Sequence, residues 1–108
     1  MININTENIH DLNGHNINTE IPIVIEGENY ISGAIINSNY KRAIKDTIIT
    51  AAITPEKNFI VDEISVIDDF GNYLEFDAIE DNPKYKMIKF IMPNVDVMIS
   101  CTINREET

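Results

Sequence analysis

The chain has 108 residues, with 18 acidic and 8 basic side chains, a formal net charge of −10 and a single cysteine. This length is typical of one domain, and a hydrophobic fraction of 44% is that of a folded chain. So acidic a surface repels nucleic-acid phosphates and anionic lipids, which argues against direct nucleic-acid binding and against membrane docking. We therefore expect a protein partner. The charge is either a solubilising surface or an acidic face directed at a basic protein.

The first twenty residues are rich in Asn, Thr and Ile, and they contain the pentapeptide Asn-Ile-Asn-Thr-Glu twice, at 3–7 and 16–20. Two copies are too few for a repeat array. The turn-forming run 11–16, with Asn-Gly at its centre, predicts an N-terminal arm or hairpin over residues 1–20. No signal-peptide pattern and no membrane-length apolar run is present. These features predict a cytoplasmic or virion location, and an extracellular one only if the chain is excised from a larger protein.

Alternating apolar residues predict a succession of short strands, at 21–26, 30–36, 45–54, 59–67, 72–78, 84–92 and 96–103. The clearest is the last, where Val97, Ile99 and Cys101 share one face. A shift of phase between Val61 and Ile64 indicates a bulge, and residues 40–49 also fit a helical turn. Turn-coded connectors roughly every ten residues predict an all-β fold. We expect an immunoglobulin-like or Greek-key β-sandwich of about seven strands over residues 21–104, with a frayed tail at 105–108.

Three segments carry a resemblance to a known family: TIITAAITP at 47–55, NFIVDEISVIDDFG at 58–71 and FIMPNVDVMISCTI at 90–103. They resemble the small β-sandwich repeat domain of Gram-positive bacterial surface proteins, over residues 33–103. The Met-Pro-x-x-Asp-Val element at 92–97 is the most specific part. The resemblance implies a sandwich domain used as a stalk, spacer or adhesive module, and it implies no catalytic residues.

No arrangement of residues points to catalysis, a metal site or a cofactor, and we expect a protein that is not an enzyme. His10 and His15 lack the further ligands that a zinc site needs, so they are interpreted as exposed loop histidines. Cys101 falls in phase with core residues and has no basic neighbour to activate its thiol. The acidic residues at 62–72 form either a solvated turn or a weak calcium site.

Two groups of residues are candidate contact sites. Ile48, Ile91 and Met98 fall where the alternation predicts water, so they form either an apolar patch for a partner or second copy, or a surface covered by the N-terminal arm at Ile21, Ile23 and Ile25. Asp68, Asp69, Glu80 and Asp81 form a candidate acidic contact. The leading expectation is a non-enzymatic protein-binding or structural module, such as a component of a phage or tail-like assembly or a bacterial surface-type module. The alternative is a small acidic inhibitor, a nucleic-acid mimic or toxin-neutralising protein that blocks a basic surface.

Overall fold

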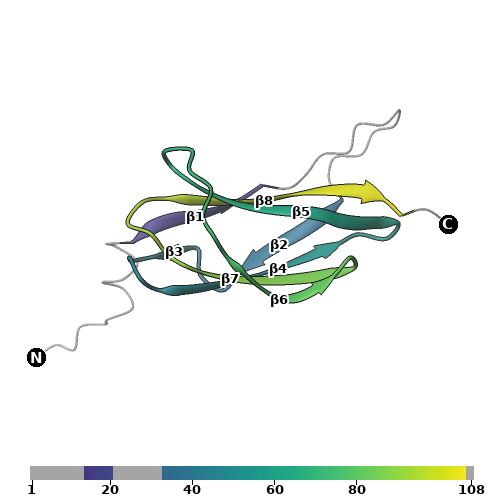
Figure 1. The fold of residues 1–108 in the computed structure, drawn as a ribbon, viewed down its shortest axis with the longest axis horizontal. Coiled ribbons are helices and arrows are strands. Elements are labelled where there is room, and N and C mark those ends of the chain that lie inside the picture. The colour runs from purple at the N-terminus through teal and green to yellow at the C-terminus, as the bar shows by residue number, and fades with distance from the viewer. Residues whose placement is uncertain (1–13, 21–32, 107–108) are drawn as a thin grey trace, which may run out of the picture.

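The protein folds as two four-stranded β-sheets packed face to face, and the predicted all-β sandwich is confirmed at this level (Figure 1). The computed structural model describes residues 14–20 and 33–106. This part of the chain contains eight strands and no helix. The strands are β1 (His15–Thr19), β2 (Ala34–Ser38), β3 (Arg42–Ala43), β4 (Ile48–Pro55), β5 (Phe59–Asp68), β6 (Asp77–Asn82), β7 (Tyr85–Ile91) and β8 (Val97–Arg105).

The strand order is β3-β1-β8-β5 in the first sheet and β2-β4-β7-β6 in the second. All pairs are antiparallel except β1 with β8, which is parallel. β5 and β6 are therefore edge strands of different sheets, and they lie along the same side of the sandwich, where the Val61 N–H donates to the Pro83 carbonyl at 3.0 Å. This shared side is important for the candidate site.

The core lies between the sheets and follows the predicted alternation. Ile49, Ala51 and Ile53 of β4 point inward, as predicted, while their neighbours point out. Such a period of two buries one face of each strand and stabilises the sandwich mainly through apolar burial. From the other strands the core receives Ile17, Ala34, Ile36, Ala43, Phe59, Val61, Val66, Ile88, Phe90, Val97, Ile99 and Cys101. The predicted bulge in β5 is present as a register shift between Val61 and Glu63.

The strand predicted at 72–78 is wrong, because β6 begins only at Asp77. Leu74 instead donates its N–H to the Val66 carbonyl at 2.8 Å, so the chain here still runs beside the first sheet. Leu74 and Phe76 pack against the core as the chain crosses from one sheet to the other. Leu74 and Phe76 alternate with polar residues because they are partly buried where the chain passes between the sheets, and not because they belong to a paired strand.

The helical turn that residues 40–49 also fitted is absent. This stretch holds β3 and the start of β4, joined by a turn at Asp46, whose φ is 74°. Asp46 donates to the Met92 carbonyl and Met92 donates to the Thr47 carbonyl, both at 2.8 Å. Pairing with the chain beyond β7 therefore outweighs the local preference for a helix.

Both ends of the described chain belong to the sheets. β1 lies in the region predicted to be an arm or hairpin, and Ile17 reaches the core. At the other end β8 runs through Arg105, whose guanidinium lies 5.5 Å from the centre of the Phe59 ring. The strand predicted at 21–26, and residues 30–32 of the next one, lie outside the described residues.

Candidate interaction surface

The segment that joins β5 to β6 crosses from the first sheet to the second along the shared edge (Figure 1). We call residues 69–76 the crossover segment. Its first turn is organised by Asp68, whose Oδ1 accepts hydrogen bonds from the backbone N–H groups of Phe70 at 2.9 Å and Asn72 at 2.8 Å. Gly71 completes the turn with a φ of 87°, which glycine adopts without steric cost. These bonds fix the shape of an otherwise exposed loop.

The hydrogen bonds to Asp68 also affect its ionisation. The backbone N–H of Asn72 is the largest cause that lowers the pKa of the Asp68 carboxyl below its ordinary value, with help from the Asn72 side chain and the N–H of Phe70. Hydrogen bonds to the charged form favour that form. Asp68 is therefore a structural anion of the loop, and it has little freedom to serve as a contact residue.

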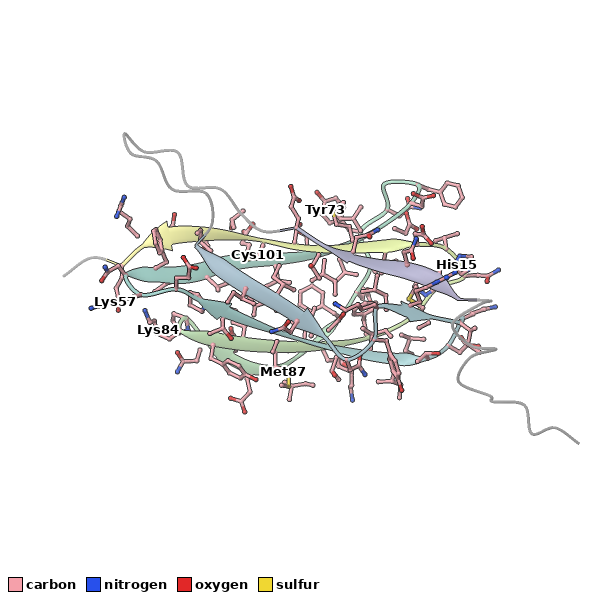
Figure 2. The ribbon with its side chains drawn as sticks, turned by 180° about the vertical axis from the view of Figure 1, so that it is seen from behind. His15, Lys57, Tyr73, Lys84, Met87 and Cys101 are labelled. Atoms are coloured by element: carbon pink, nitrogen blue, oxygen red, sulfur yellow. The ribbon has the colours of Figure 1, made fainter. Side chains whose placement is uncertain are left out.

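Two aromatic side chains stand out from the crossover segment. The Phe70 side chain is 75% exposed and that of Tyr73 is 74% exposed, and Figure 2 shows Tyr73 directed away from the space between the sheets. Large aromatic residues carry much of the binding energy in protein interfaces. Because the Asp68 hydrogen bonds hold the loop in one shape, binding through these rings would cost little ordering of the backbone.

A hollow of about 690 Å³ opens on one side of the crossover segment, where β7 extends past β6. β6 pairs with β7 only as far as Asp77 opposite Lys89, so the end of β7 at Ile91 has no β6 residue beside it. The hollow combines an apolar wall with two carboxylates and one lysine. Its lining is Leu74, Glu75, Phe76, Asp77, Lys89, Phe90 and Ile91.

A second hollow, of about 310 Å³, lies where the loop approaches the start of β8. It also places carboxylates next to an exposed apolar side chain, since Met98 is 40% exposed. Its lining is Asn18, Ile67, Asp68, Asp69, Gly71, Asp96, Val97 and Met98. We call the crossover segment with the two hollows the crossover surface.

The stretch of chain that supplies this edge carries acidic residues only. Between Lys57 and Lys84 the chain has eight acidic residues and no basic one, namely Asp62, Glu63, Asp68, Asp69, Glu75, Asp77, Glu80 and Asp81. Among the described residues only Asp81 of this group forms an ion pair, with the Lys86 Nζ at 2.5 Å. The remaining carboxylates leave a negative field along β5, the crossover segment and β6.

The predicted apolar patch is not a single patch. Ile48 and Ile91 are directly opposite each other on β4 and β7, 56% and 64% exposed, whereas Met98 lies on β8 in the other sheet. Side chains that point outward from two packed sheets face in opposite directions. Ile91 and Met98 are instead related through the crossover surface, where each lines a different hollow. The alternative, that Ile21, Ile23 and Ile25 cover this patch, concerns residues outside the described ones.

The four predicted acidic residues also separate into two places. Asp68 and Asp69 lie at the end of β5 beside Met98, while Glu80 and Asp81 lie in β6 near the turn to β7. The carbonyl of Pro83, within that turn, accepts a hydrogen bond from the N–H of Val61. Val61 is seven residues before Asp68, which corresponds to roughly 23 Å at about 3.3 Å per strand residue. The charge is thus spread along the edge and not concentrated at one point.

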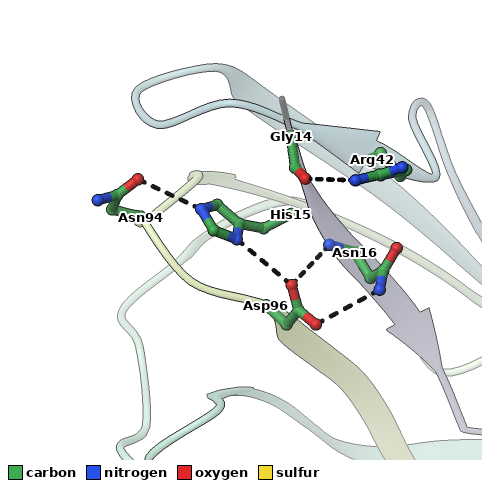
Figure 3. Close-up of polar contacts among 6 residues, drawn as sticks. All are labelled: Gly14, His15, Asn16, Arg42, Asn94 and Asp96. Carbon is green, nitrogen blue, oxygen red and sulfur yellow. Dashed lines mark hydrogen bonds and ion pairs between the residues drawn. The ribbon is translucent and has the colours of Figure 1, made fainter. Parts of the chain in front are cut away.

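The remaining reactive side chains have structural surroundings. Cys101 is buried between the sheets (Figure 2), and burial, with the nearby charge of Glu20, raises the pKa of its thiol to about 11. His15 lies between Asp96 and Asn94 (Figure 3). The described residues hold no group of three or more His, Cys, Asp or Glu side chains that could bind a metal ion. In the same residues, no helix is long and apolar enough to cross a membrane.

The residues that the sequence analysis missed are Phe70, Tyr73, Glu75 and Asp77. The signal available in the sequence was an aromatic residue inside a strong turn, in a stretch without any basic residue. Comparisons with protein-family models, with curated proteins and with solved structures found no match to this chain. The resemblance to bacterial surface repeat domains therefore stays a prediction.

Proposed function

We propose that the protein is a non-enzymatic protein-binding module that uses the crossover surface to contact a basic protein surface. The observation that carries the proposal is the coincidence, along one edge, of a hydrogen-bonded loop, two exposed aromatic rings and a row of carboxylates from a stretch of sequence that has no basic residue. Of the two expectations from the sequence, this proposal is nearer to the small acidic inhibitor than to the component of a phage or tail-like assembly.

The chemistry of the two hollows supports a partner with lysine or arginine side chains. Each hollow offers apolar walls for the stem of such a side chain and a carboxylate for its charged end, with Glu75 and Asp77 at one and Asp69 at the other. Lysine and arginine bury their methylene groups against apolar surface while the charge stays at the rim. Phe70 and Tyr73 offer rings over which a cation can also lie.

The proposal is tested by affinity capture with three forms of the chain as bait. The first is the wild type, and the second carries Asp69→Asn, Glu75→Gln and Glu80→Gln on the acidic edge. The control carries Asp46→Asn, Glu20→Gln and Glu56→Gln, which change the net charge equally but lie elsewhere. A partner of the crossover surface is retained by the wild type and the control and lost by the edge variant. Equal retention by the edge variant contradicts the proposal.

A captured partner allows a sharper measurement. Phe70→Ala and Tyr73→Ala should each weaken binding about tenfold or more if the rings are central anchors. The association rate should fall as salt rises from low to physiological concentration, because the attraction between exposed charges is screened. Binding that is insensitive to both changes would place the contact on another face.

A second candidate function is self-assembly through Ile48 and Ile91. These two isoleucines face each other across β4 and β7 and are both more than half exposed, which is unusual for a cross-strand pair on a solvated face. Light scattering after size exclusion, at low and moderate salt, should then show a dimer or larger ring at both salts. Ile48→Thr with Ile91→Thr should convert it to a monomer. A wild-type chain that is monomeric at both salts rejects this candidate.

A further inference from the structure

β6 is the last strand of the second sheet, and its one neighbour among the described strands is β7 (Figure 1). All six of its residues, Asp77–Asn82, are exposed. The backbone N–H and C=O groups on the outer side of such an edge strand are free to pair with a strand of another molecule. Which groups these are follows from the pairing of β7.

The direction of the β7 backbone is fixed just beyond its end. Met92 donates its N–H to the Thr47 carbonyl, and its own carbonyl accepts from the Asp46 N–H, both at 2.8 Å, so this residue bonds on the side of β4. Successive residues of a strand direct their backbone groups to opposite sides. The even-numbered residues of β7 therefore bond to β4, and the odd-numbered residues bond to β6.

The same reasoning applied to β6 leaves two residues with free backbone groups. The odd-numbered residues of β7 stand opposite Asp77, Glu80 and Asn82. Ala78 and Asp81 stand opposite even-numbered residues, so their N–H and C=O groups point away from β7. Among the described residues, no backbone group of another element bonds to them. The outer side of β6 is thus an open edge.

The inner face of β6 is uncovered around Ala78. Ala78 lies opposite Ile88, so the two side chains share the face that points toward the first sheet. Ile88 is 0% exposed but Ala78 is exposed, which means that the first sheet does not extend over β6. Ile79, next to Ala78, is 46% exposed. A strand added beside β6 could bury apolar side chains against this face.

The outer face of β6 presents two carboxylates. Asp77 lies opposite Lys89, which is exposed on the outer face of β7, and Glu80 lies opposite Met87 on the same face. Neither carboxylate forms an ion pair with a described residue. The side chains of an added strand would alternate between the inner and the outer face. Apolar residues would therefore suit the inner face, and basic residues would suit the outer one.

We propose that β6 accepts an extended segment of the partner protein as an antiparallel fifth strand of the second sheet, and that lysine or arginine alternates with apolar residues in this segment. Antiparallel pairing is the arrangement of all three strand pairs in this sheet. Backbone hydrogen bonds hold such a strand, and its alternate side chains make it specific. The acidic strands β5 and β6 of a second copy do not fit this description. The proposal rests on the function proposed above, because β6 begins at Asp77 in the lining of the larger hollow.

The test uses a seven-residue synthetic peptide of alternating lysine and valine, blocked at both ends, which is titrated into the full chain and followed by NMR. A residue that bonds to Ala78 or Asp81 in antiparallel pairing lies opposite it and shares its face, so the valine N–H groups should point at β6. N-methylation of the valines should therefore weaken binding about tenfold or more. N-methylation of the lysines, the matched control, should leave the affinity unchanged. The unmodified peptide should also slow hydrogen exchange at the amides of Ala78 and Asp81.

Two results with the peptides would overturn the strand pairing. Equal affinity of the two methylated peptides would do so and still leave the acidic contact of the proposed function in place, because charge attraction does not depend on backbone N–H groups. The absence of any shift of the β6 amides with the unmodified peptide at millimolar concentration would also overturn it. The affinity capture described above decides the proposed function separately.

A pair of protein variants tests whether the outer carboxylates of β6 hold the basic side chains. Asp77→Asn with Glu80→Gln should weaken binding of the unmodified peptide about fivefold, because two exposed charge pairs are lost. Asp46→Asn with Glu56→Gln changes the net charge equally and should leave the affinity unchanged. An equal loss in both variants would mean that the peptide responds to net charge alone, and the proposed seat on β6 would be wrong.

Discussion

Two neighbouring isoleucines of β4 give the sharpest test of the sandwich, because they differ in little except the face to which they point. Ile49 is fully buried, whereas Ile48 is 56% exposed opposite Ile91. Removing three carbons from Ile49 leaves a cavity in a close-packed core, and removing them from Ile48 mainly uncovers surface that is already wet. Alanine at the two positions should thus have very different effects.

The expected sizes follow from burial. Ile49→Ala should reduce the free energy of unfolding by about 2–5 kcal/mol, the range for truncating a buried isoleucine. Ile48→Ala is a substitution at an exposed position and should change the free energy of unfolding by about 0.5 kcal/mol or less. If the cross-strand contact with Ile91 also contributes to stability, the change should reach at most about 1 kcal/mol. A domain of this size has about 5–15 kcal/mol in total, so the first variant loses a large fraction of it.

Urea denaturation followed by circular dichroism measures both variants, and the slope of each transition shows whether unfolding stays two-state. Similar losses for the two variants would refute the assignment of faces. A larger loss for Ile48→Ala would mean that β4 is shifted by one residue, because a shift of one exchanges the buried and exposed sets.

Three further predictions concern single residues. Gly14→Ala should cost about 1–3 kcal/mol in urea denaturation, because its Cβ would lie 2.9 Å from the Ala43 backbone; a neutral result would mean that β1 moves freely against β3. Alkylation of Cys101 at pH 8 should be slow in the folded protein and should follow unfolding, since its pKa is raised to about 11; rapid labelling without urea would contradict its burial. The pKa of Asp68 is lowered from its ordinary value of 3.8, so the charged carboxylate stabilises the loop at pH values above 3.8. This stabilisation is lost as the pH falls below 3.8 and the carboxylate becomes protonated. Amide signals of residues 70–72 should therefore shift in acid, and Asp68→Asn should remove that transition; an unchanged transition would assign it to another group.

The fold was predictable where alternation decides it. In β4 and β8 the apolar side chains recur every second residue, and the inward set found in the structure is the one that the period requires. The prediction failed for β6, where Asp77–Asn82 contains four polar residues and all six are exposed. An edge strand outside the core has no apolar period, and its place is determined by pairing with β7, which the local sequence does not encode.

The candidate site was predictable in its charge but not in its geometry. The acidic residues at 68–69 and 80–81 were identified as one candidate contact, but they lie at the end of β5 and within β6, and their separation depends on how the two sheets stack. Met98 and Ile91 share a pattern of exposure yet belong to different sheets. Period-two reasoning assigns a face to each residue within one strand, and it contains no information about which strands become neighbours.

The carboxylates along β5 and β6 have a consequence for how copies of this protein meet one another. An uncovered strand edge can pair with the edge of a neighbouring molecule, which is a route to aggregation. Here any such approach brings together two rows of like charge, and the Pro83 and Leu74 contacts already occupy part of the β5 backbone. Like charge therefore disfavours pairing of this edge with a second copy. Neutralising it should make the protein more prone to precipitate.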